Sequence, residues 1–446
     1  MSHALFTDLY ELTMAEAYLA AGCTGRATFE LYFRHLPPRR GYAIACGLDD
    51  ALTWLEGLRF APEDLDYLRG LGIFGDRLFA ELERLRFTGD VWAVPEGTLI
   101  FGNEPILRVE APIVEAQLAE TWLLNQIHVQ TVIATKAARV VEAARGRTVV
   151  EFGARRAHGH DAAMKVARAT WLAGFAGTSL VEAGQRWGIP VYGTMAHSFV
   201  QAFGDERRAF ERFATVHPGS TLLVDTWDTR EGVRLVAELA TRAKDPLRVG
   251  AIRIDSGDLG AEAREARRIL DEAGLTGVRI IASSDLDEWR VAELVESGAP
   301  IDGFGVGTRL VVSEDAPSLG VVYKLVAYEG EGRIKLSPTK VLYPGPKQIF
   351  RQAEGGVLAG DVVGRADEEL PGARLLVPVM RQGRRLDPPE PLEAIRARIR
   401  AGLDALPTRL RALDPGGPPY PVRHSEALRA DLEAARAALE PAHAAS

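Results

Sequence analysis

The segment 191–199, VYGTMAHSF, contains the residues with the clearest potential for chemistry. The apolar residues up to Tyr192 are typical of a buried strand, Gly193 and Thr194 interrupt the run, and a helical pattern follows His197. A strand that turns into a helix directs backbone N–H groups outward, where they can bind an anion, and a histidine there can transfer a proton or act as a nucleophile. His197 taken alone fits a capping residue equally well, so a catalytic role needs support from other residues.

Short apolar runs followed by polar residues recur between residues 148 and 304, and helical patterns separate them. Repeated strand–helix units of this size favour a parallel sheet, and so many in series favour an irregular α/β barrel of the TIM type. In such barrels the active site lies at the carboxyl ends of the strands, so we expect the polar residues there to converge. The predicted strands are Thr148–Phe152, Thr178–Val181, Pro190–Tyr192, Thr221–Val224, Gly250–Ile254, Arg279–Ala282 and Ile301–Phe304.

Arg253 and Asp255 lie two residues apart in IRIDSGD. Side chains two apart on a strand point the same way, so both can face the mouth of the barrel. The guanidinium fork of Arg253 suits a carboxylate or a phosphate. Asp255 and Asp258 could hold ribose hydroxyls or a magnesium ion. Alternatively, the arginine and the aspartates form an ion pair that only stabilises the fold.

Two further strand ends suit a flat anionic ligand and a phosphate. In EFGARR, Phe152 offers an aromatic face beside the guanidinium of Arg155, although a core phenylalanine beside a surface arginine is the alternative. In GVGT, Gly305 and Gly307 let the backbone approach a phosphate just before Thr308. Barrels often bind phosphate at their last strands.

No set of residues predicts a metal centre held by protein ligands alone. His158, His160 and Asp161 lack a helical i, i+4 histidine pair and an obvious third ligand. Cys23 and Cys46 are the only cysteines, which excludes a zinc knuckle, and we expect both thiols to be reduced.

Composition indicates a globular protein with no nucleic-acid or membrane partner. The 446 residues are 47% hydrophobic and 26% charged, with a formal net charge of -8 and no basic run. No apolar run reaches membrane-spanning length, and the first residues lack the charged start and apolar core of a signal peptide. We therefore expect a cytoplasmic protein.

We expect three parts along the chain. Residues 1–125 form an N-terminal α+β domain that includes a half-buried strand at 27–33. Residues 126–335 form the catalytic barrel, and residues 336–446 form a small C-terminal segment, partly packed on the N-terminal domain, with a terminal helix at 425–440. Further helices are expected at 9–22, 45–58, 62–71 and 76–85, and one long helix or two joined ones at 113–144. Further strands are expected within 89–110 and at 321–326, 333–336 and 348–351.

Motifs in a consistent order along the first 351 residues closely resemble the nicotinate phosphoribosyltransferase family. They are FTDLYELTMA (6–15), FELYFRHLP (29–37), EFGARRAHG (151–159), GFAGTS (174–179), GTMAHSF (193–199), IRIDSGDL (252–259), DGFGVGTRL (302–310), KLSPTK (335–340) and PGPKQIFR (344–351).

The resemblance implies the type II phosphoribosyltransferase fold, an α/β barrel with an α+β domain, in a homodimer with shared active sites. It implies that nicotinate, 5-phosphoribosyl 1-diphosphate, ATP and water give nicotinate mononucleotide, diphosphate, ADP and phosphate in NAD biosynthesis or salvage. ATP would be a co-substrate that phosphorylates a histidine, and Mg²⁺ (or Mn²⁺) would accompany the diphosphate. The enzyme would be a pentosyltransferase with a ligase-like ATP requirement.

The resemblance also implies roles for individual residues. His197 matches the phosphorylated histidine, Tyr10 a ring contact from the partner subunit, and Thr194 a nicotinate contact. The nicotinamide-using relative has an aspartate where this chain has Ser179; since a carboxylate would repel nicotinate, Ser179 favours the acid. The predicted catalytic residues are His197, Arg253 and Asp255, and the predicted substrate-binding residues are Tyr10, Phe152, Arg155, Ser179, Thr194, Gly305, Gly307 and Thr308.

Two alternatives stay open. A sibling enzyme could use nicotinamide, against which Ser179 argues, or quinolinate, which needs no ATP-linked histidine. A non-catalytic barrel could instead bind a phosphorylated metabolite as a sensor, although no site residue is missing.

Overall fold

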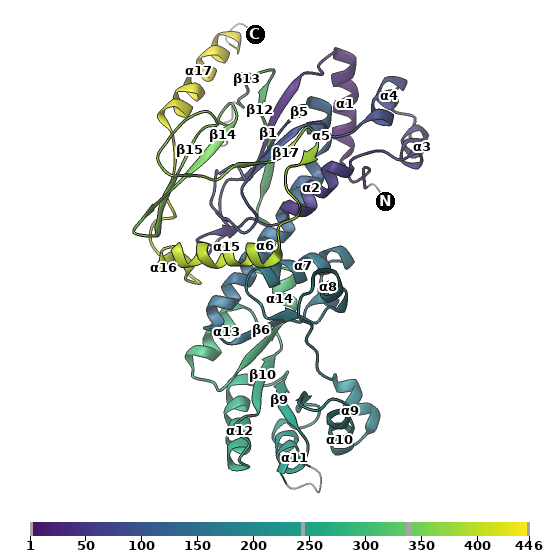
Figure 1. Cartoon of the computed structure of the whole chain (residues 1–446), viewed down its shortest axis with the longest axis vertical. Helices are drawn as coiled ribbons and strands as arrows, with labels where there is room; N and C mark the ends of the chain where they lie inside the picture. Colours follow the sequence, from purple (N-terminus) through teal and green to yellow (C-terminus); the bar gives the residue numbers. More distant parts are fainter. Residues whose placement is uncertain (1–2, 242–245, 336–340, 444–446) are drawn as a thin grey trace. The chain divides into compact units, whose positions relative to one another are not determined.

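The computed structural model describes residues 3–241, 246–335 and 341–443. It forms two compact units, Met1–Val132 with Ser318–Ser446, and Ile133–Pro317 (Figure 1). The domain ranges 1–125, 126–335 and 336–446 stay predictions.

The unit Ile133–Pro317 is built on a six-stranded sheet with the order β7-β6-β11-β10-β9-β8. All its ladders are parallel, and β11 pairs with β6, so the last strand returns beside the first. The strands therefore follow one another around a curved sheet, which confirms the predicted irregular α/β barrel. The bounds are β6 Thr148–Glu151, β7 Gly177–Thr178, β8 Ser220–Leu223, β9 Val249–Ile254, β10 Arg279–Ser283 and β11 Gly303–Val306.

The predicted strand Pro190–Tyr192 is wrong as a full strand, because it forms only a single parallel bridge between Val191 and Thr178. Tyr192 N–H donates to the Thr178 carbonyl at 2.9 Å, and Thr178 N–H donates to the Pro190 carbonyl at 3.1 Å. Pro190 has no N–H of its own to extend the ladder. Among the described residues, no ladder joins this segment to β8, so the barrel stays open at that seam.

Helices follow the barrel strands, and aspartates begin several of them. Asp258 accepts hydrogen bonds from the N–H groups of Gly260 and Ala261, and Asp287 accepts one from Arg290, so both cap helices. The elements are η1 Ala154–Arg156, α7 His160–Leu172, α8 Val181–Trp187, α9 His197–Phe203, α10 Glu206–Val216, α11 Thr229–Thr241, α12 Leu259–Glu272, α13 Glu288–Glu296 and α14 Thr308–Val311.

The other unit contains a seven-stranded antiparallel sheet with the order β13-β12-β1-β5-β3-β17-β18, a four-stranded sheet with the order β16-β14-β15-β19, and the pair β2-β4. The strands are β1 Arg26–Phe33, β2 Ala43–Ile44, β3 Asp90–Ala93, β4 Leu99–Ile100, β5 Leu107–Pro112, β12 Val321–Tyr328, β13 Glu331–Gly332, β14 Lys347–Glu354, β15 Val357–Arg365, β16 Ala373–Arg374, β17 Val377–Arg381, β18 Arg384–Arg385 and β19 Val422–His424.

The helices expected in this part of the chain are present. The expected helix at 113–144 is two helices, α5 and α6, with a break at Ala119. The bounds are α1 Leu9–Ala21, α2 Leu48–Gly57, α3 Pro62–Gly70, α4 Asp76–Arg84, α5 Ile113–Leu118, α6 Glu120–Ala144, α15 Leu392–Ala405, α16 Thr408–Arg411 and α17 Glu426–His443.

Two strand expectations need correction in this unit, and a third, Thr178–Val181 in the barrel, is wrong beyond Thr178, because α8 begins at Val181. The alternating run in β1 predicted a half-buried strand, but both of its faces are buried, and Glu30 is only 1% exposed. The Lys347 ammonium of β14 lies 2.8 Å from Glu30 Oε2, so an ion pair allows the polar face to be covered. The strand expected at 333–336 is wrong at 333–335, where no strand forms, and Leu336 lies outside the described residues.

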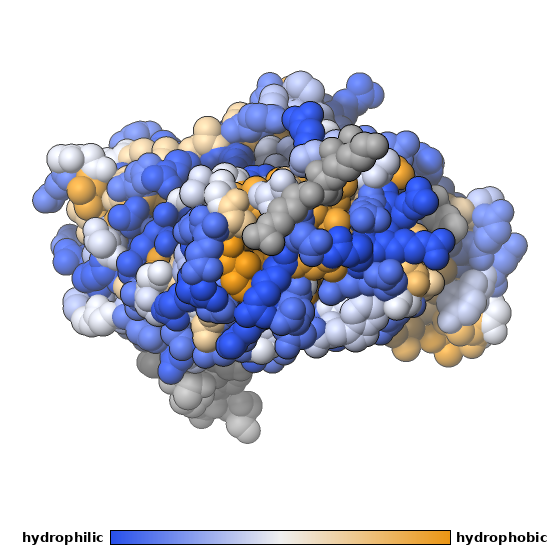
Figure 2. All heavy atoms as spheres, turned by 90° about the horizontal axis from the view of Figure 1, so that it is seen from below, coloured by the Kyte–Doolittle hydropathy of each residue, from blue (hydrophilic) through white to orange (hydrophobic). Residues whose placement is uncertain are grey.

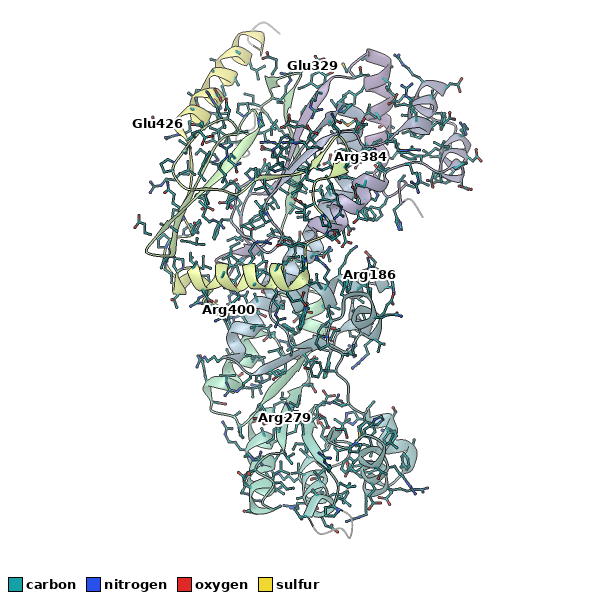
Figure 3. All side chains as sticks on the ribbon, in the orientation of Figure 1. Arg186, Arg279, Glu329, Arg384, Arg400 and Glu426 are labelled. Carbon is teal, nitrogen blue, oxygen red and sulfur yellow. The ribbon has the colours of Figure 1, made fainter. Side chains whose placement is uncertain are left out.

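The visible surface is largely hydrophilic, with smaller hydrophobic areas (Figure 2). The six charged side chains labelled in Figure 3 are all exposed. Within the described ranges, no helix combines the length and apolarity needed to cross a membrane.

Candidate active site

A cavity of about 180 Å³ lies at the carboxyl ends of β6, β9, β10 and β11. Polar side chains and glycines form most of its wall, and seven predicted site residues are among them. The lining residues are Phe152, Arg155, Arg156, Arg253, Asp255, Ser283, Ser284, Asp285, Gly305, Gly307 and Thr308. The strand ends therefore converge as the barrel interpretation requires.

The Phe152 ring packs against β11 at a position where only glycine fits. A Cβ on Gly305 would lie 2.5 Å from Phe152 Cδ2, far closer than van der Waals contact. The Phe152 N–H donates to the Val306 carbonyl at 2.8 Å, and this hydrogen bond holds the Phe152 backbone against β11. Arg155 follows in η1 with an exposed side chain. An aromatic surface and a guanidinium thus border one cavity.

Arg253 is held in the cavity wall by one hydrogen bond and keeps another donor available. Its Nη1 donates to Thr194 Oγ1 at 2.7 Å, whereas its Nε is buried without a partner among the described residues. Burial lowers the pKa of Arg253, and the nearby carboxylates of Asp255 and Asp225 oppose that shift. A buried guanidinium with a spare N–H suits an anionic ligand.

His197 is the first residue of α9, and its ring lies between a hydroxyl and a carboxylate. Nδ1 lies 3.2 Å from Thr226 Oγ1, and Nε2 lies 3.8 Å from Asp255 Oδ2. Asp255 is itself fixed, because its Oδ1 accepts a hydrogen bond from Ser283 Oγ at 2.6 Å. The imidazole is 40% exposed, so it is oriented by neighbours and still open to a reactant.

Sequence reasoning did not single out Asp225 and Thr226 as site residues. Asp225 Oδ2 accepts hydrogen bonds from Asp255 N–H at 2.8 Å and Ser256 Oγ at 2.6 Å, and its Oδ1 is buried without a partner in the described structure. Thr226 is the contact to His197. Both residues follow the predicted strand Thr221–Val224 and belong to the polar strand ends that were expected to converge, although neither was predicted as a site residue.

Ser179 and Tyr10 lie outside the cavity wall. Ser179 follows β7, and its N–H donates to the Glu151 carbonyl at 2.9 Å, next to the ring-bearing loop. Tyr10 belongs to α1 in the other unit and is 43% exposed. Burial raises the pKa of Tyr10, and the negative charge of Glu120 adds to the shift. The expected role of Tyr10 in a partner's site stays a prediction.

Within the described residues, no group of three or more His, Cys, Asp or Glu side chains is arranged to hold a metal ion. His160 Nε2 lies 2.8 Å from Glu182 Oε2, and Asp161 pairs with Lys165, so both have ordinary partners.

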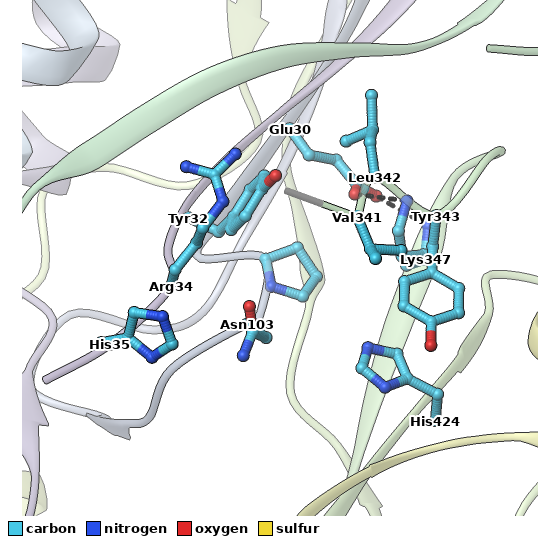
Figure 4. Close-up of a pocket in the computed structure, with 11 residues that line it drawn as sticks. Glu30, Tyr32, Arg34, His35, Asn103, Val341, Leu342, Tyr343, Lys347 and His424 are labelled. Carbon is cyan, nitrogen blue, oxygen red and sulfur yellow. Dashed lines mark hydrogen bonds and ion pairs between the residues drawn. The ribbon is translucent and has the colours of Figure 1, made fainter. Parts of the chain in front are cut away.

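A second cavity, of about 270 Å³, lies in the other unit and includes no predicted site residue (Figure 4). Its wall contains the Lys347–Glu30 ion pair and the Tyr343 ring, which stacks on His424 with 4.0 Å between ring centroids. Burial, together with the nearby cations Lys347 and Arg429, lowers the pKa of His424 to about 4.

Comparison with known sequences agrees with the geometry. The family model for the nicotinate phosphoribosyltransferase (NAPRTase) N-terminal domain matches residues 5–128, and that for the nicotinate phosphoribosyltransferase (NAPRTase) family matches residues 148–335. The chain belongs to the nicotinate phosphoribosyltransferase family. The second match spans the whole cavity wall.

Similar proteins include other members of the nicotinate phosphoribosyltransferase family. Nicotinate phosphoribosyltransferase pncB2 of Mycobacterium tuberculosis is 57% identical, with 96% of this chain and 93% of that protein aligned. Nicotinate phosphoribosyltransferase of Bacillus subtilis is 46% identical over 83% of this chain and 77% of that protein. The crystal structure of human nicotinic acid phosphoribosyltransferase superposes with a TM-score of 0.85 at 29% identity, covering 96% of this chain and 99% of that one.

Proposed function

We propose that this protein transfers the phosphoribosyl group of 5-phosphoribosyl 1-diphosphate to nicotinate, giving nicotinate mononucleotide and diphosphate in NAD biosynthesis or salvage. Relatives at 57% and 46% identity carry the name of this activity. In the structure, the observation that carries the proposal is the cavity that both Phe152 and Arg253 line. A planar ring with one carboxylate needs both an aromatic surface and a cation.

Transfer requires positioning more than covalent chemistry by the protein. The pyridine nitrogen attacks the anomeric carbon of the ribose as diphosphate departs, through a transition state with oxocarbenium character. The free N–H of Arg253 would bind the nicotinate carboxylate, while Thr194 holds the guanidinium in place. The segment Gly305–Thr308 would bind phosphate oxygens with backbone N–H groups and the threonine hydroxyl. Holding the two reactants in line supplies most of the rate enhancement.

Mg²⁺ (or Mn²⁺) would enter with the diphosphate, and the acidic residues present fit such an ion. Asp255 borders the cavity, and the unpartnered Oδ1 of the neighbouring Asp225 is a free hard oxygen. Magnesium typically binds one or two carboxylates together with substrate phosphates and water. When bound, the ion would offset negative charge on the departing diphosphate. Asp258 does not fit this role as well, because its carboxylate caps α12.

ATP would act as a co-substrate that phosphorylates His197. This part of the proposal rests on the resemblance and on the position of the ring, which is 40% exposed and held by Thr226 and Asp255. A histidine nucleophile must be unprotonated at the attacking nitrogen and oriented at the other. Hydrolysis of the phosphohistidine would couple ATP use to transfer, which gives the enzyme its ligase-like requirement.

A cytoplasmic homodimer with shared active sites would complete the site. Phe6, Leu9 and Tyr10 are 43%, 54% and 43% exposed at the start of the chain, which is unusual for large apolar side chains and suits an interface. Tyr10 would then reach the nicotinate ring of the partner subunit.

The experiment that tests the proposal is product formation from nicotinate and 5-phosphoribosyl 1-diphosphate with Mg²⁺, with and without ATP, and with nicotinamide as a competing acceptor. We expect nicotinate mononucleotide, faster formation with ATP, and little amide product. Product formation at the same rate with and without ATP would support the transferase activity and contradict its coupling to ATP. Binding of nicotinate without turnover would favour the sensor, and a preference for nicotinamide would favour the sibling enzyme.

A further inference from the structure

Glu151 and Thr178 are two fully buried polar residues at the carboxyl ends of β6 and β7. We propose that they are positioning residues, which fix the ring-bearing loop at Phe152 relative to the turn at Ser179 and thereby set the affinity for nicotinate and its selection over nicotinamide. This inference rests on the proposed function and deepens it, since it concerns the acceptor side of the same site.

The Glu151 carboxylate joins two neighbouring segments. Its Oε1 accepts a hydrogen bond from the N–H of Gly153, which lies in the loop between Phe152 and Arg155, and its Oε2 accepts one from Thr178 Oγ1 at 2.5 Å. Burial raises the pKa of Glu151, and these two hydrogen bonds oppose the shift. A fully buried carboxyl group needs such partners, because unpaired it would be costly to bury.

Thr178 extends the link to two further segments. Its hydroxyl donates to Glu151 and accepts from the N–H of Leu180 at 3.0 Å, which places Ser179 inside the hydrogen-bonded turn. Its backbone bridges to Val191 in the run that continues to Thr194 and His197. One threonine therefore contacts the Ser179 turn and the segment that leads to His197, and it is linked to the ring-bearing loop through the Glu151 carboxylate.

Packing around Gly153 shows that the loop has little room to adjust independently. A Cβ at Gly153 would lie 2.2 Å from Val311 Cγ1 and 2.9 Å from the Gly307 carbonyl oxygen. Loss of the Thr178 hydroxyl would leave Glu151 Oε2 without its donor in a closed environment, so the carboxylate would rotate and move Gly153. Phe152 and Arg155 flank Gly153 and would move with it.

The effect should be larger on the acceptor side. The loop that would move carries Phe152 and Arg155, whereas Asp255 lies on a different strand end and is held by Ser283 and by the Asp225 carboxylate. Because the Gly307 carbonyl packs against Gly153, binding of 5-phosphoribosyl 1-diphosphate should also change, but less than binding of nicotinate. A general loss of structure would impair both substrates equally.

The test compares Thr178→Val, which removes the hydroxyl at nearly constant shape, with Thr178→Ser, which keeps it. Thr170→Val is the matched control, because Thr170 is equally buried and, among the described residues, its hydroxyl donates to the Ala167 carbonyl within α7 and to no part of the site. Calorimetry would give the Kd for nicotinate, and kinetics would give the KM of each substrate and the nicotinate-to-nicotinamide ratio. We expect Thr178→Val to weaken nicotinate binding about tenfold and to reduce the ratio, with Thr178→Ser and Thr170→Val near wild type.

Several results would overturn the inference. Wild-type nicotinate affinity and selectivity in Thr178→Val would do so, as would equal losses for both substrates. If Thr178→Val does not fold, Glu151→Gln gives the same test. The amide nitrogen that replaces one carboxylate oxygen cannot accept a hydrogen bond, so either the Gly153 N–H or the Thr178 hydroxyl loses its acceptor. Nicotinate binding to the wild type without turnover would refute the proposed function alone, whereas absence of nicotinate binding to the wild type would refute both.

Discussion

Gly305→Ala should damage the acceptor side of the site through a single methyl group. A Cβ at this position would lie 2.5 Å from Phe152 Cδ2 and 2.6 Å from Cε2, whereas ordinary van der Waals contacts begin at 3.4 Å. The ring edge would therefore have to retreat by about 1 Å. Phe152 cannot retreat freely, since its N–H is bonded to the Val306 carbonyl on β11.

The expected cost follows from that displacement. Overpacking by one methyl group typically costs about 1–3 kcal/mol of stability. Misplacing a substrate-positioning group by about 1 Å can cost up to about 100-fold in rate. We therefore expect kcat/KM for nicotinate to fall about 10- to 100-fold, mainly through a higher KM, with a smaller change for 5-phosphoribosyl 1-diphosphate.

The assay is steady-state formation of nicotinate mononucleotide with each substrate varied, together with urea unfolding of the same preparations. Gly277→Ala is the matched control, because a Cβ there meets nothing within 4 Å. A folded Gly305→Ala variant with a wild-type KM for nicotinate would refute the reasoning, because the Phe152 ring would then not form part of the acceptor site.

Three further predictions address coupling, selectivity and pH. His197→Ala should lose the stimulation of turnover by ATP and keep a slow ATP-independent transfer, because the variant lacks the histidine that accepts the phosphoryl group but keeps the cavity for nicotinate. Unchanged stimulation would exclude His197 from the coupling. Ser179→Asp should shift selectivity from nicotinate towards nicotinamide by about tenfold or more, because a carboxylate repels the acid and can accept from the amide, and an unchanged ratio in competition assays would contradict this. Burial lowers the pKa of His424 to about 4, so the folded protein keeps it neutral while the unfolded chain binds a proton below about pH 6.5. The stability that neutral His424 contributes above about pH 6.5 is therefore lost as the pH falls towards 4. In urea unfolding, His424→Phe should lose less stability than the wild type between pH 7 and pH 5. Equal losses would show that His424 does not titrate in this way.

Most of the cavity wall could be predicted from the sequence because parallel barrels bring strand ends to one rim. Phe152 ends a recognisable apolar run, Arg253 lies one residue before the end of another, and Thr308 follows a third; all three border the cavity. The same rule underlies the prediction for His197, whose ring contacts Thr226 and approaches Asp255. Local patterns were sufficient there, since the relevant geometry is a property of every strand–helix unit.

By itself, then, the sequence determined where most of the barrel strands lie along the chain and which residue types follow them, because hydrophobic periodicity and turn residues are local properties. Only the tertiary structure decided which partners those residues have. Glu30 is buried because Lys347, more than 300 positions later, provides its counter-charge, and Gly305 matters because the Phe152 ring occupies the space of a Cβ. Likewise, the link from Glu151 to Thr178 joins strands whose pairing no local pattern specifies. Such contacts form only when segments far apart in the chain pack together, so local sequence patterns do not specify them.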